Sequence, residues 1–417
     1  MMRFLCILLC LMLPCAAVAE APAEHVDYAG QLGLNPNGTV VCEASVKTFV
    51  DGDTTHFYVP ASVHPDGVFK ARYLAINTPE TTGKVEEWGK KAAAFTREKL
   101  TGADSIILQS EDETWNLDST GERHLVWVWY RTAGESVYRC LNLEILQNGL
   151  ARANATASNR YGGVCQAALN QAKAEKLNLY SGQKDPDFYY GDAIEMTLRE
   201  LRLSVDAYAG KKVAFNGVVT LNDGQSVYVE AHDPDTGLYF GMPVYYGFNL
   251  SGAGLDILSV GNEVRIVGTL QFYEAGGTWQ VSGLSYRPMK PTDPGNIQKL
   301  SSGHSAAYPP VAAENFAGSI VIDGQNYPFA ETALGTTIEV AGLTVMSGTA
   351  SEDGSMTLVC TAQGAEITVR TNPLYDQGAL ITPDRYIGQT VVVRGVVEFH
   401  DGGYQIRALL PGHITLH

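Results

Sequence analysis

The chain has 417 residues, of which 45% are hydrophobic and 18% charged, and its formal net charge is −16 at pH 7. The charge is uneven, because residues 40–184 hold 16 Lys and Arg against 17 Asp and Glu, whereas residues 185–417 hold 12 against 25. Affinity for nucleic acid through phosphate neutralisation needs positive charge. The composition therefore argues against a nonspecific DNA clamp in the C-terminal part, where the acidic residues favour solubility.

The first 19 residues have the pattern of a secretory signal peptide. Arg3 precedes an apolar run from Phe4 to Leu13, and residues 17–19 fit a small-x-small cleavage site. The run is shorter than the roughly 20 apolar residues that a membrane span needs. We therefore expect a signal peptide at residues 1–19, a leader at residues 20–37, and a protein without a membrane span that is secreted or associated with the cell envelope.

Few cysteines follow the leader, and a count this low does not indicate a disulfide scaffold. They are Cys42, Cys140, Cys165 and Cys360. Two alternatives remain open: a disulfide bridge between Cys140 and Cys165, or four free thiols.

The first strands are expected around an acidic turn. Apolar residues alternate in residues 46–50 and 55–59, on either side of Asp51-Gly52-Asp53. Alternation around a short glycine turn predicts a β-hairpin, so two carboxylates lie at its tip. A third strand is expected from Phe69 to Ile76.

Oxygen-bearing residues follow the third strand, in the segment Asn77-Thr78-Pro79-Glu80. Pro79 has no N–H to donate and holds Thr78 extended. We therefore expect the Thr78 carbonyl and the Asn77 and Glu80 side chains to be free for a ligand. Oxygen ligands of this kind suit a hard cation such as Ca²⁺.

The elements that follow predict a barrel with added helices. Residues 86–100 have helical spacing, and strands are expected to begin at residues 105 and 124. Two closing helices are expected around residues 143–150 and 164–172. Three strands, a helix, two strands and closing helices is the order of a five-stranded OB barrel with added helices.

Residues 47–81 resemble the signature of the staphylococcal nuclease (thermonuclease) family, in which a strand, DGDT, a further strand and R-x4-DTPET follow one another. This chain has DGDT at residues 51–54 and RYLAINTPET at residues 72–81. The likeness continues through AFT at residues 94–96, the N-x-x-L-x-x-x-G-L-A helix at residues 142–151 and the segment 172–181. It implies a nuclease-type OB barrel with three helices over residues 38–184.

The resemblance implies a calcium site. Asp53 matches the calcium-ligand aspartate, with Asp51 as a supporting acid, and Thr78 matches the residue whose carbonyl binds calcium. The family's second calcium aspartate is replaced by Asn77, which keeps an oxygen ligand and removes one negative charge. We therefore expect calcium binding that is weaker, or more dependent on the phosphate of the substrate.

The resemblance also implies three catalytic residues. Arg72 and Arg123 match the phosphate-binding arginines, and Glu80 matches the glutamate proposed to orient or deprotonate the attacking water. Hydrolysis of a phosphodiester needs a positioned water, a cation on the phosphoryl oxygens, and positive charge where the transition state becomes negative. In the alternative interpretation, Arg72 and Arg123 are surface partners of Glu80 and Glu122.

Two further departures from the family concern substrate contacts. Glu122 interrupts the glycine-arginine pair, so Arg123 needs a turn that is one residue longer. The family's substrate-contacting tyrosines correspond here to Ala155 and Ala157. Nucleotide stacking is therefore either lost or taken over by Tyr161.

The C-terminal part is expected to contain two related units, over residues 192–290 and 318–417. Corresponding residues keep one offset of 127 positions, in the pairs Gly261 and Gly388, Gly268 and Gly395, and Phe272 and Phe399. Short alternating strands and Gly-rich turns predict OB-like β-barrels. The expected fold class is therefore mainly β with α, a nuclease-type OB barrel with three helices followed by two further OB-like β-barrels.

The ligand of the two tail barrels is left open. OB barrels often bind single strands through aromatic residues, and the tail offers Tyr228, Tyr245, Tyr246, Tyr273 and Trp279. The acidic charge favours the other interpretation, in which these rings are core and strand-pair residues. Substrate recruitment, binding of envelope carbohydrate and a spacer role all remain open.

We therefore expect a secreted, monomeric, Ca²⁺-dependent endonuclease that hydrolyses DNA and RNA and leaves 3′-phosphates, as the resemblance implies. One alternative is a nuclease-like barrel inactivated by Asn77 that still binds nucleic acid through Arg72 and Arg123. The other is an envelope protein whose tail barrels bind the relevant ligand. Glu80 together with both arginines favours the enzyme, since a binding module has no use for a water-orienting glutamate.

Overall fold

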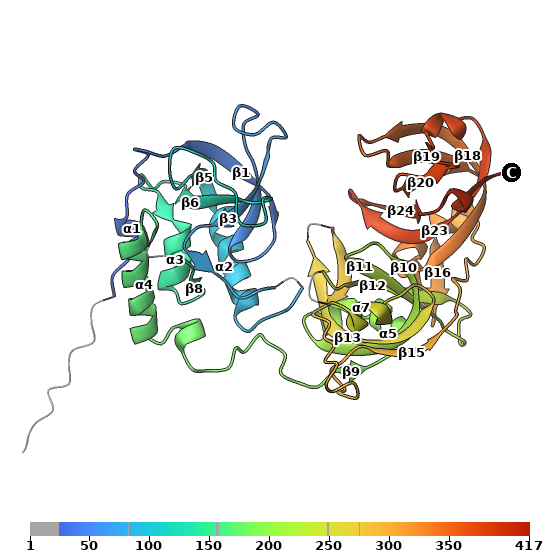
Figure 1. The fold of residues 1–417 in the computed structure, drawn as a ribbon, viewed down its shortest axis with the longest axis horizontal. Helices are drawn as coiled ribbons and strands as arrows, with labels where there is room; N and C mark the ends of the chain where they lie inside the picture. Colours follow the sequence, from blue (N-terminus) through green and yellow to red (C-terminus); the bar gives the residue numbers. More distant parts are fainter. Residues whose placement is uncertain (1–24, 82, 156–157, 248–249, 275) are drawn as a thin grey trace, which may run out of the picture.

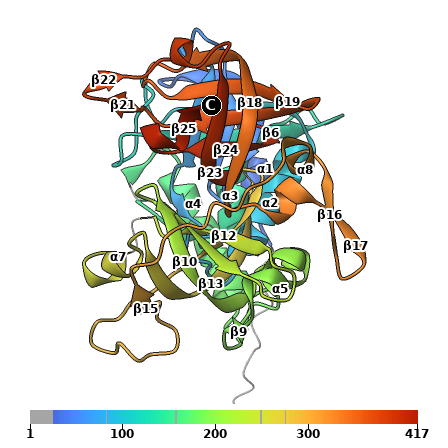
Figure 2. The ribbon, with the colours of Figure 1, turned by 90° about the vertical axis from the view of Figure 1, so that its right-hand side faces the viewer.

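The computed structural model describes residues 25–81, 83–155, 158–247, 250–274 and 276–417, and it contains three β-barrels (Figure 1). Figure 2 views the molecule from the side of the third barrel, which lies above the second. The predicted signal peptide at residues 1–19, the first part of the expected leader and Ala157 lie outside the described residues. Within these residues, no helix has the length and apolar character to cross a membrane.

The first barrel closes five strands in the order β3-β2-β1-β5-β6, with β3 also pairing with β6. The strands are β1 (Val41–Phe49), β2 (Thr54–Tyr58), β3 (Val68–Tyr73), β5 (Ala103–Gln109) and β6 (His124–Thr132). This order confirms the predicted OB barrel. The third strand ends at Tyr73, earlier than expected, because Ala75 has a left-handed φ of 69° and only β4 (Ile76–Asn77) is extended again.

Helices pack beside this barrel. They are α1 (Tyr28–Gln31), α2 (Gly89–Thr101), α3 (Leu141–Gln147) and α4 (Gly162–Ala174), with the short elements β7 (Arg139–Cys140), β8 (Arg152–Ala153) and η2 (Asn178–Tyr180). The α2 helix begins later than the predicted residue 86, because the Glu86 N–H donates back to the Glu80 carbonyl over 2.9 Å. A Cβ at Gly89 would lie 2.6 Å from the Glu80 carbonyl oxygen. The start of α2 therefore packs directly on the segment that carries Glu80.

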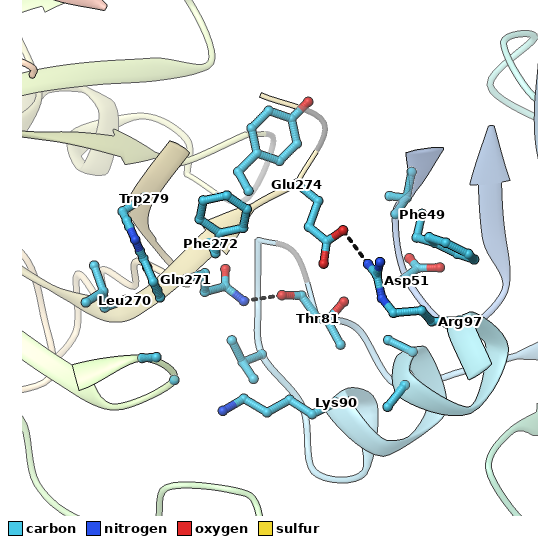
Figure 3. A pocket seen from close by; sticks show the side chains of 17 residues that line it. Phe49, Asp51, Thr81, Lys90, Arg97, Leu270, Gln271, Phe272, Glu274 and Trp279 are labelled. Atoms are coloured by element: carbon cyan, nitrogen blue, oxygen red, sulfur yellow. Dashed lines mark hydrogen bonds and ion pairs between the residues drawn. The ribbon is translucent and has the colours of Figure 1, made fainter. Parts of the chain in front are cut away.

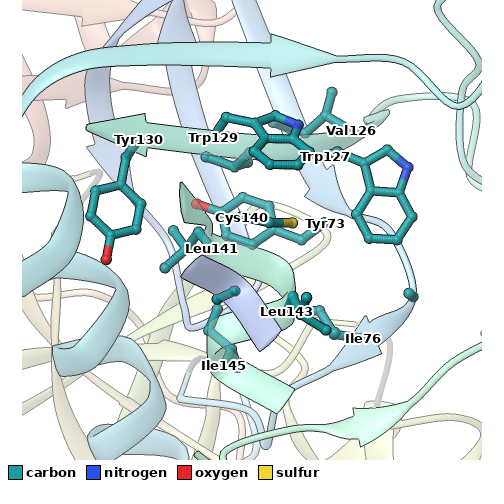
Figure 4. Packing of buried hydrophobic residues seen from close by; sticks show 14 of the residues in the cluster. Tyr73, Ile76, Val126, Trp127, Trp129, Tyr130, Cys140, Leu141, Leu143 and Ile145 are labelled. Carbon is teal, nitrogen blue, oxygen red and sulfur yellow. The ribbon is translucent and has the colours of Figure 1, made fainter. Parts of the chain in front are cut away.

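Two tryptophans of β6 anchor the first core (Figure 4). Trp127 and Trp129 are fully buried, and their indole N–H groups donate to Glu111 and Gln109 over 2.8 Å each. These hydrogen bonds stabilise the folded chain, because a buried N–H group without an acceptor costs free energy of folding. Cys140 lies in the same core, and all four cysteines of the described chain are free and buried, so the alternative of free thiols holds.

The tail forms two further five-stranded barrels with the strand order of the first. The second contains β10 (Lys212–Asn222), β11 (Ser226–His232), β12 (Tyr239–Tyr245), β13 (Asn262–Tyr273) and β14 (Thr278–Ser282). The third contains β18 (Thr337–Ala350), β19 (Met356–Ala362), β20 (Ala365–Thr371), β23 (Thr390–His400) and β24 (Gly403–Ala408). In all three barrels the third and fifth strands pair in parallel and the first and fourth antiparallel.

The internal repeat places glycines at equivalent close approaches. A Cβ at Gly268 would lie 2.6 Å from the Ser282 carbonyl oxygen, and one at Gly395 would lie 2.5 Å from that of Arg407. Both contacts join the fourth strand to the fifth. The offset seen in the sequence therefore reflects one steric requirement, met twice, where these strands cross closely.

Short elements connect and cover the tail barrels. Around the second are β9 (Ile194–Glu195), α5 (Leu198–Leu203), α6 (Val205–Tyr208), α7 (Ala253–Ile257) and β15 (Gln298–Ser302). Around the third are α8 (Ala313–Phe316), β16 (Ser319–Ile322), β17 (Gln325–Pro328), α9 (Phe329–Thr332), β21 (Tyr375–Asp376), β22 (Ala379–Leu380), η3 (Pro383–Arg385), η4 (Pro411–His413) and β25 (Ile414–Leu416). Phe316 packs in the third core and Ile322 in the second, so this connection touches both.

Candidate active site

The acidic turn between β1 and β2 is pressed against two other segments. The Gly52 carbonyl accepts a hydrogen bond from the Thr96 hydroxyl of α2 over 2.6 Å. A Cβ at Gly52 would lie 2.8 Å from Thr78 Cγ2 and 2.9 Å from Ala92 Cβ. Glycine is therefore required for the turn to lie between α2 and the segment that follows β4.

Asp53 is the centre of this arrangement. Its side chain is fully buried, and its Oδ2 accepts a hydrogen bond from the Thr78 N–H over 2.7 Å. Burial and the neighbouring Asp51 carboxylate raise the pKa of Asp53, whereas the positive charge of Arg72 and the Thr78 N–H oppose this rise. The prediction that Asp53 and Thr78 lie together agrees with this geometry.

Arg72 joins two of the predicted metal ligands. One of its terminal nitrogens donates to Asp53 Oδ1 and the other to Asn77 Oδ1, and its side chain is only 12% exposed. The Asn77 side chain, which was expected to be free for a ligand, accepts a hydrogen bond from Arg72 in this structure. The guanidinium and a metal ion would use the same two oxygen atoms.

The oxygen atoms around Asp53 fit a hard cation. A carboxylate, the Asn77 amide oxygen and the Thr78 carbonyl belong to adjacent segments, and the buried Thr78 hydroxyl has no hydrogen-bond partner among the described residues. Within that part of the chain, no three His, Cys, Asp or Glu side chains gather around one point. The protein therefore offers a weakly charged, mostly neutral ligand set, which suits a metal that binds together with phosphate.

Glu80 lies close to this group. Its side chain is partly buried, and burial together with the negative charge of Asp51 raises the pKa of Glu80. The positive charges of Arg72 and Arg123 act in the opposite direction. Both predicted arginines therefore lie near enough to influence the charge of Glu80.

Arg123 reaches the site through the parallel pairing of β6 with β3, which places Arg72 opposite Leu125. A turn precedes it, in which the Asp118 N–H donates to the Arg123 carbonyl over 2.8 Å and Gly121 has a φ of 75°. The Arg123 Nε donates to Asp118 Oδ2 over 2.7 Å. Asp118 was not among the site residues expected from the sequence, and its position five residues before an arginine was the available signal.

In the structure, Arg72 and Arg123 are not surface partners of Glu80 and Glu122. Arg72 pairs with Asp53 and Arg123 pairs with Asp118, whereas Glu122 lies 3.9 Å from Lys70. The charges of both arginines are therefore held by carboxylates inside the site and its supporting turn.

Tyr161 does not replace the missing substrate-contacting tyrosines. It is 8% exposed, packs edge-on against Trp127 with ring centroids 4.9 Å apart, and donates its hydroxyl to Gln109. The stacking role considered for Tyr161 is therefore wrong, because the ring is part of the core.

Most of the candidate site lies in a region that matches a known protein family. The family model described as staphylococcal nuclease homologue matches residues 70–182, and a search of curated proteins found no match for the chain. The matched range begins within β3 and includes Arg72, Glu80 and Arg123. Residues 70–182 therefore form a domain of the staphylococcal nuclease homologue family.

Proposed function

We propose that this chain is a secreted, Ca²⁺-dependent nuclease that hydrolyses phosphodiester bonds of DNA and RNA as an endonuclease and leaves 3′-phosphates. The observation that carries the proposal is the position of Glu80, a partly buried carboxylate within the influence of two arginine charges. It lies in the domain that the nuclease family model matches.

Asp53, the Asn77 amide oxygen and the Thr78 carbonyl would hold Ca²⁺. When bound, the ion would supply positive charge to the phosphoryl oxygens. Arg72 already donates to Asp53 and Asn77, so it must release one of these bonds when a cation binds. A phosphate at the surface of the site provides the acceptor that takes its place, because Arg binds phosphate oxygens bidentately.

Glu80 has the properties of a general base. Its pKa is raised mainly by burial, and a base becomes stronger as its pKa approaches the working pH. The carboxylate orients a water molecule and accepts its proton as the water oxygen attacks phosphorus. The 5′ oxygen leaves and takes a proton from water, so the phosphate stays on the 3′ side, while Arg72 and Arg123 stabilise the negative charge of the transition state.

Cleavage of supercoiled plasmid and of RNA by the purified full chain tests this function. The assay is run with Ca²⁺, with chelator, and with the variants Glu80→Gln and Glu43→Gln. Glu43 is an exposed residue of β1, so it is a matched control for the loss of one carboxylate. We expect chelator to abolish cleavage and Glu80→Gln to lower the rate about 10²- to 10⁴-fold, the range for losing a general base.

Two other results would change the conclusion. Equal activity of Glu80→Gln and the unaltered chain would refute the role of Glu80. Absence of cleavage at high calcium, with salt-sensitive binding of nucleic acid retained, would favour the binding protein inactivated by Asn77.

A further inference from the structure

An open cleft of about 350 Å³ lies between the first and second barrels (Figure 3). One wall comes from the end of β1 and from α2, and includes Phe49, Asp51, Lys90 and Arg97. The facing wall comes from the hairpin of β13 and β14, and includes Gln271, Phe272, Tyr273, Glu274 and Trp279. Because Asp51 belongs to the turn that carries Asp53, and Thr81 follows Glu80, the cleft borders two segments of the candidate active site.

Two contacts hold the second barrel against this site. The Gln271 side-chain amide donates to the carbonyl of Thr81, the residue after Glu80. Arg97 of α2 forms an ion pair with Glu274 at the end of β13. Both contacts are visible in Figure 3, where the side chains of the two barrels face each other. The hairpin is therefore attached to the segment that carries Glu80.

The hairpin presents aromatic rings beside the cleft. Phe272 is 48% exposed and meets Trp279 edge-on, with ring centroids 5.4 Å apart. The hairpin joins the fourth and fifth strands of an OB barrel, and the loop between these strands is one of the regions through which OB barrels bind oligonucleotides. Phe272 is exposed, whereas Trp279 is partly buried and packs against the core of the second barrel. Rings whose faces remain accessible at such a place provide surfaces on which bases stack.

The opposite wall carries positive charge. Lys90 lines the cleft, and its ammonium group is within 4.0 Å of no carboxylate of the described residues. Arg97 is compensated by Glu274 and stacks over Phe49, with the guanidinium carbon 4.4 Å from the ring centre. Lys90 is therefore the cation in this wall that remains for a phosphate.

The first barrel does not supply stacking residues of its own at the expected place. Tyr161 is buried in the core, and Ala155 has no ring on which a base could stack. The aromatic rings of the β13–β14 hairpin that line the cleft belong to the second barrel.

We propose that this cleft binds the single-stranded segment of nucleic acid next to the scissile phosphodiester, with bases stacked on Phe272 and Trp279 and a backbone phosphate at Lys90. This proposal rests on the proposed function in one respect, namely that the bound strand contains a phosphodiester bond that the chain cleaves. Stacking accepts every base, so the site extends substrate binding without sequence preference. The second barrel thereby becomes part of the substrate-binding surface.

Binding is measured on the full chain in chelator, with a fluorescein-labelled 12-nucleotide single strand and a duplex of the same sequence. Trp279→Ala should weaken binding of the single strand roughly 5- to 150-fold, the range for losing one stacked base, and Trp279→Phe should retain most of it. Tyr375→Ala, which removes an exposed ring of the third barrel, is the matched control and should bind as the unaltered chain does. Lys90→Gln should reduce the slope of log affinity against log salt by about 0.7, the value for one phosphate contact with a single strand.

Cleavage provides the second readout. The ratio of kcat/KM for the 12-nucleotide strand to that for a dinucleotide should fall in Trp279→Ala and stay constant in Tyr375→Ala. Equal binding and an equal ratio in Trp279→Ala would overturn the subsite, even if the chain is an active nuclease. Weakened binding in Trp279→Ala without cleavage by any form would support the subsite while refuting the nuclease function.

Discussion

Replacing Gly52 by Ala should destabilise the first barrel by about 1–2 kcal/mol. The added Cβ would lie 2.8 Å from Thr78 Cγ2 and 2.9 Å from Ala92 Cβ, and overpacking of a packed site costs roughly 1–3 kcal/mol. Gly52 does not have a left-handed φ, so Ala would otherwise gain about 0.4–1 kcal/mol from the lower entropy of the unfolded chain. The steric effect therefore decides the sign.

Urea unfolding followed by tryptophan emission measures this change. Trp127 and Trp129 are buried in the first core, so their emission reports on unfolding of that barrel. With an m-value of about 2 kcal/mol per molar urea, the unfolding midpoint should fall by roughly 0.5–1 M. Because the turn carries Asp51 and Asp53, the calcium concentration for half-maximal cleavage should rise in the same variant.

Two variants separate the steric effect from a general effect of Gly to Ala. Gly163 lies in α4 with nothing within 4 Å of an added Cβ, so Gly163→Ala should stabilise the chain by up to about 1 kcal/mol. In a double-mutant cycle, Ala92→Gly should offset part of the cost of Gly52→Ala. A Gly52→Ala midpoint equal to or above that of the unaltered chain would refute the reasoning.

Three further changes test other parts of the structure. Asn77→Asp adds a carboxylate to the ligand set, so a calcium titration of cleavage should show half-maximal activity at a concentration lowered about tenfold or more; an unchanged midpoint would argue against Asn77 as a ligand. Asp118→Asn removes the charge that holds the Arg123 guanidinium, and kcat/KM should fall by up to about 100-fold, as expected when a catalytic group is displaced by about 1 Å; full activity would show that the pair is dispensable. Glu230 is buried and accepts hydrogen bonds from the N–H and hydroxyl of Thr337, and burial raises its pKa above 4.5. The folded chain therefore binds this proton more tightly than the unfolded chain, so its contribution to stability is lost as the pH rises from about 4.5 through the raised pKa; Glu230→Gln should flatten this dependence in urea unfolding at pH 5 and pH 7, and parallel profiles would contradict it.

The sequence alone predicted the barrels and suggested the candidate site residues. Alternation of apolar residues depends only on the period of a strand, and the offset between Gly268 and Gly395 depends on a steric requirement repeated in each tail barrel. Asp53, Thr78 and Glu80 follow from short motifs, because their positions are set by a turn and by Pro79. These features are local, and local rules predict them.

Only the tertiary structure decided which of these residues contact one another. Arg72 lies between Asp53 and Asn77, an arrangement that depends on how three strands and a turn meet. Tyr161, the residue before α4, lies in the core, where its ring packs against Trp127 and Trp129 of β6. The cleft beside Phe272 brings together segments almost two hundred residues apart, whose contact depends on the docking of two barrels, and no spacing along the chain specifies how folded surfaces pack together.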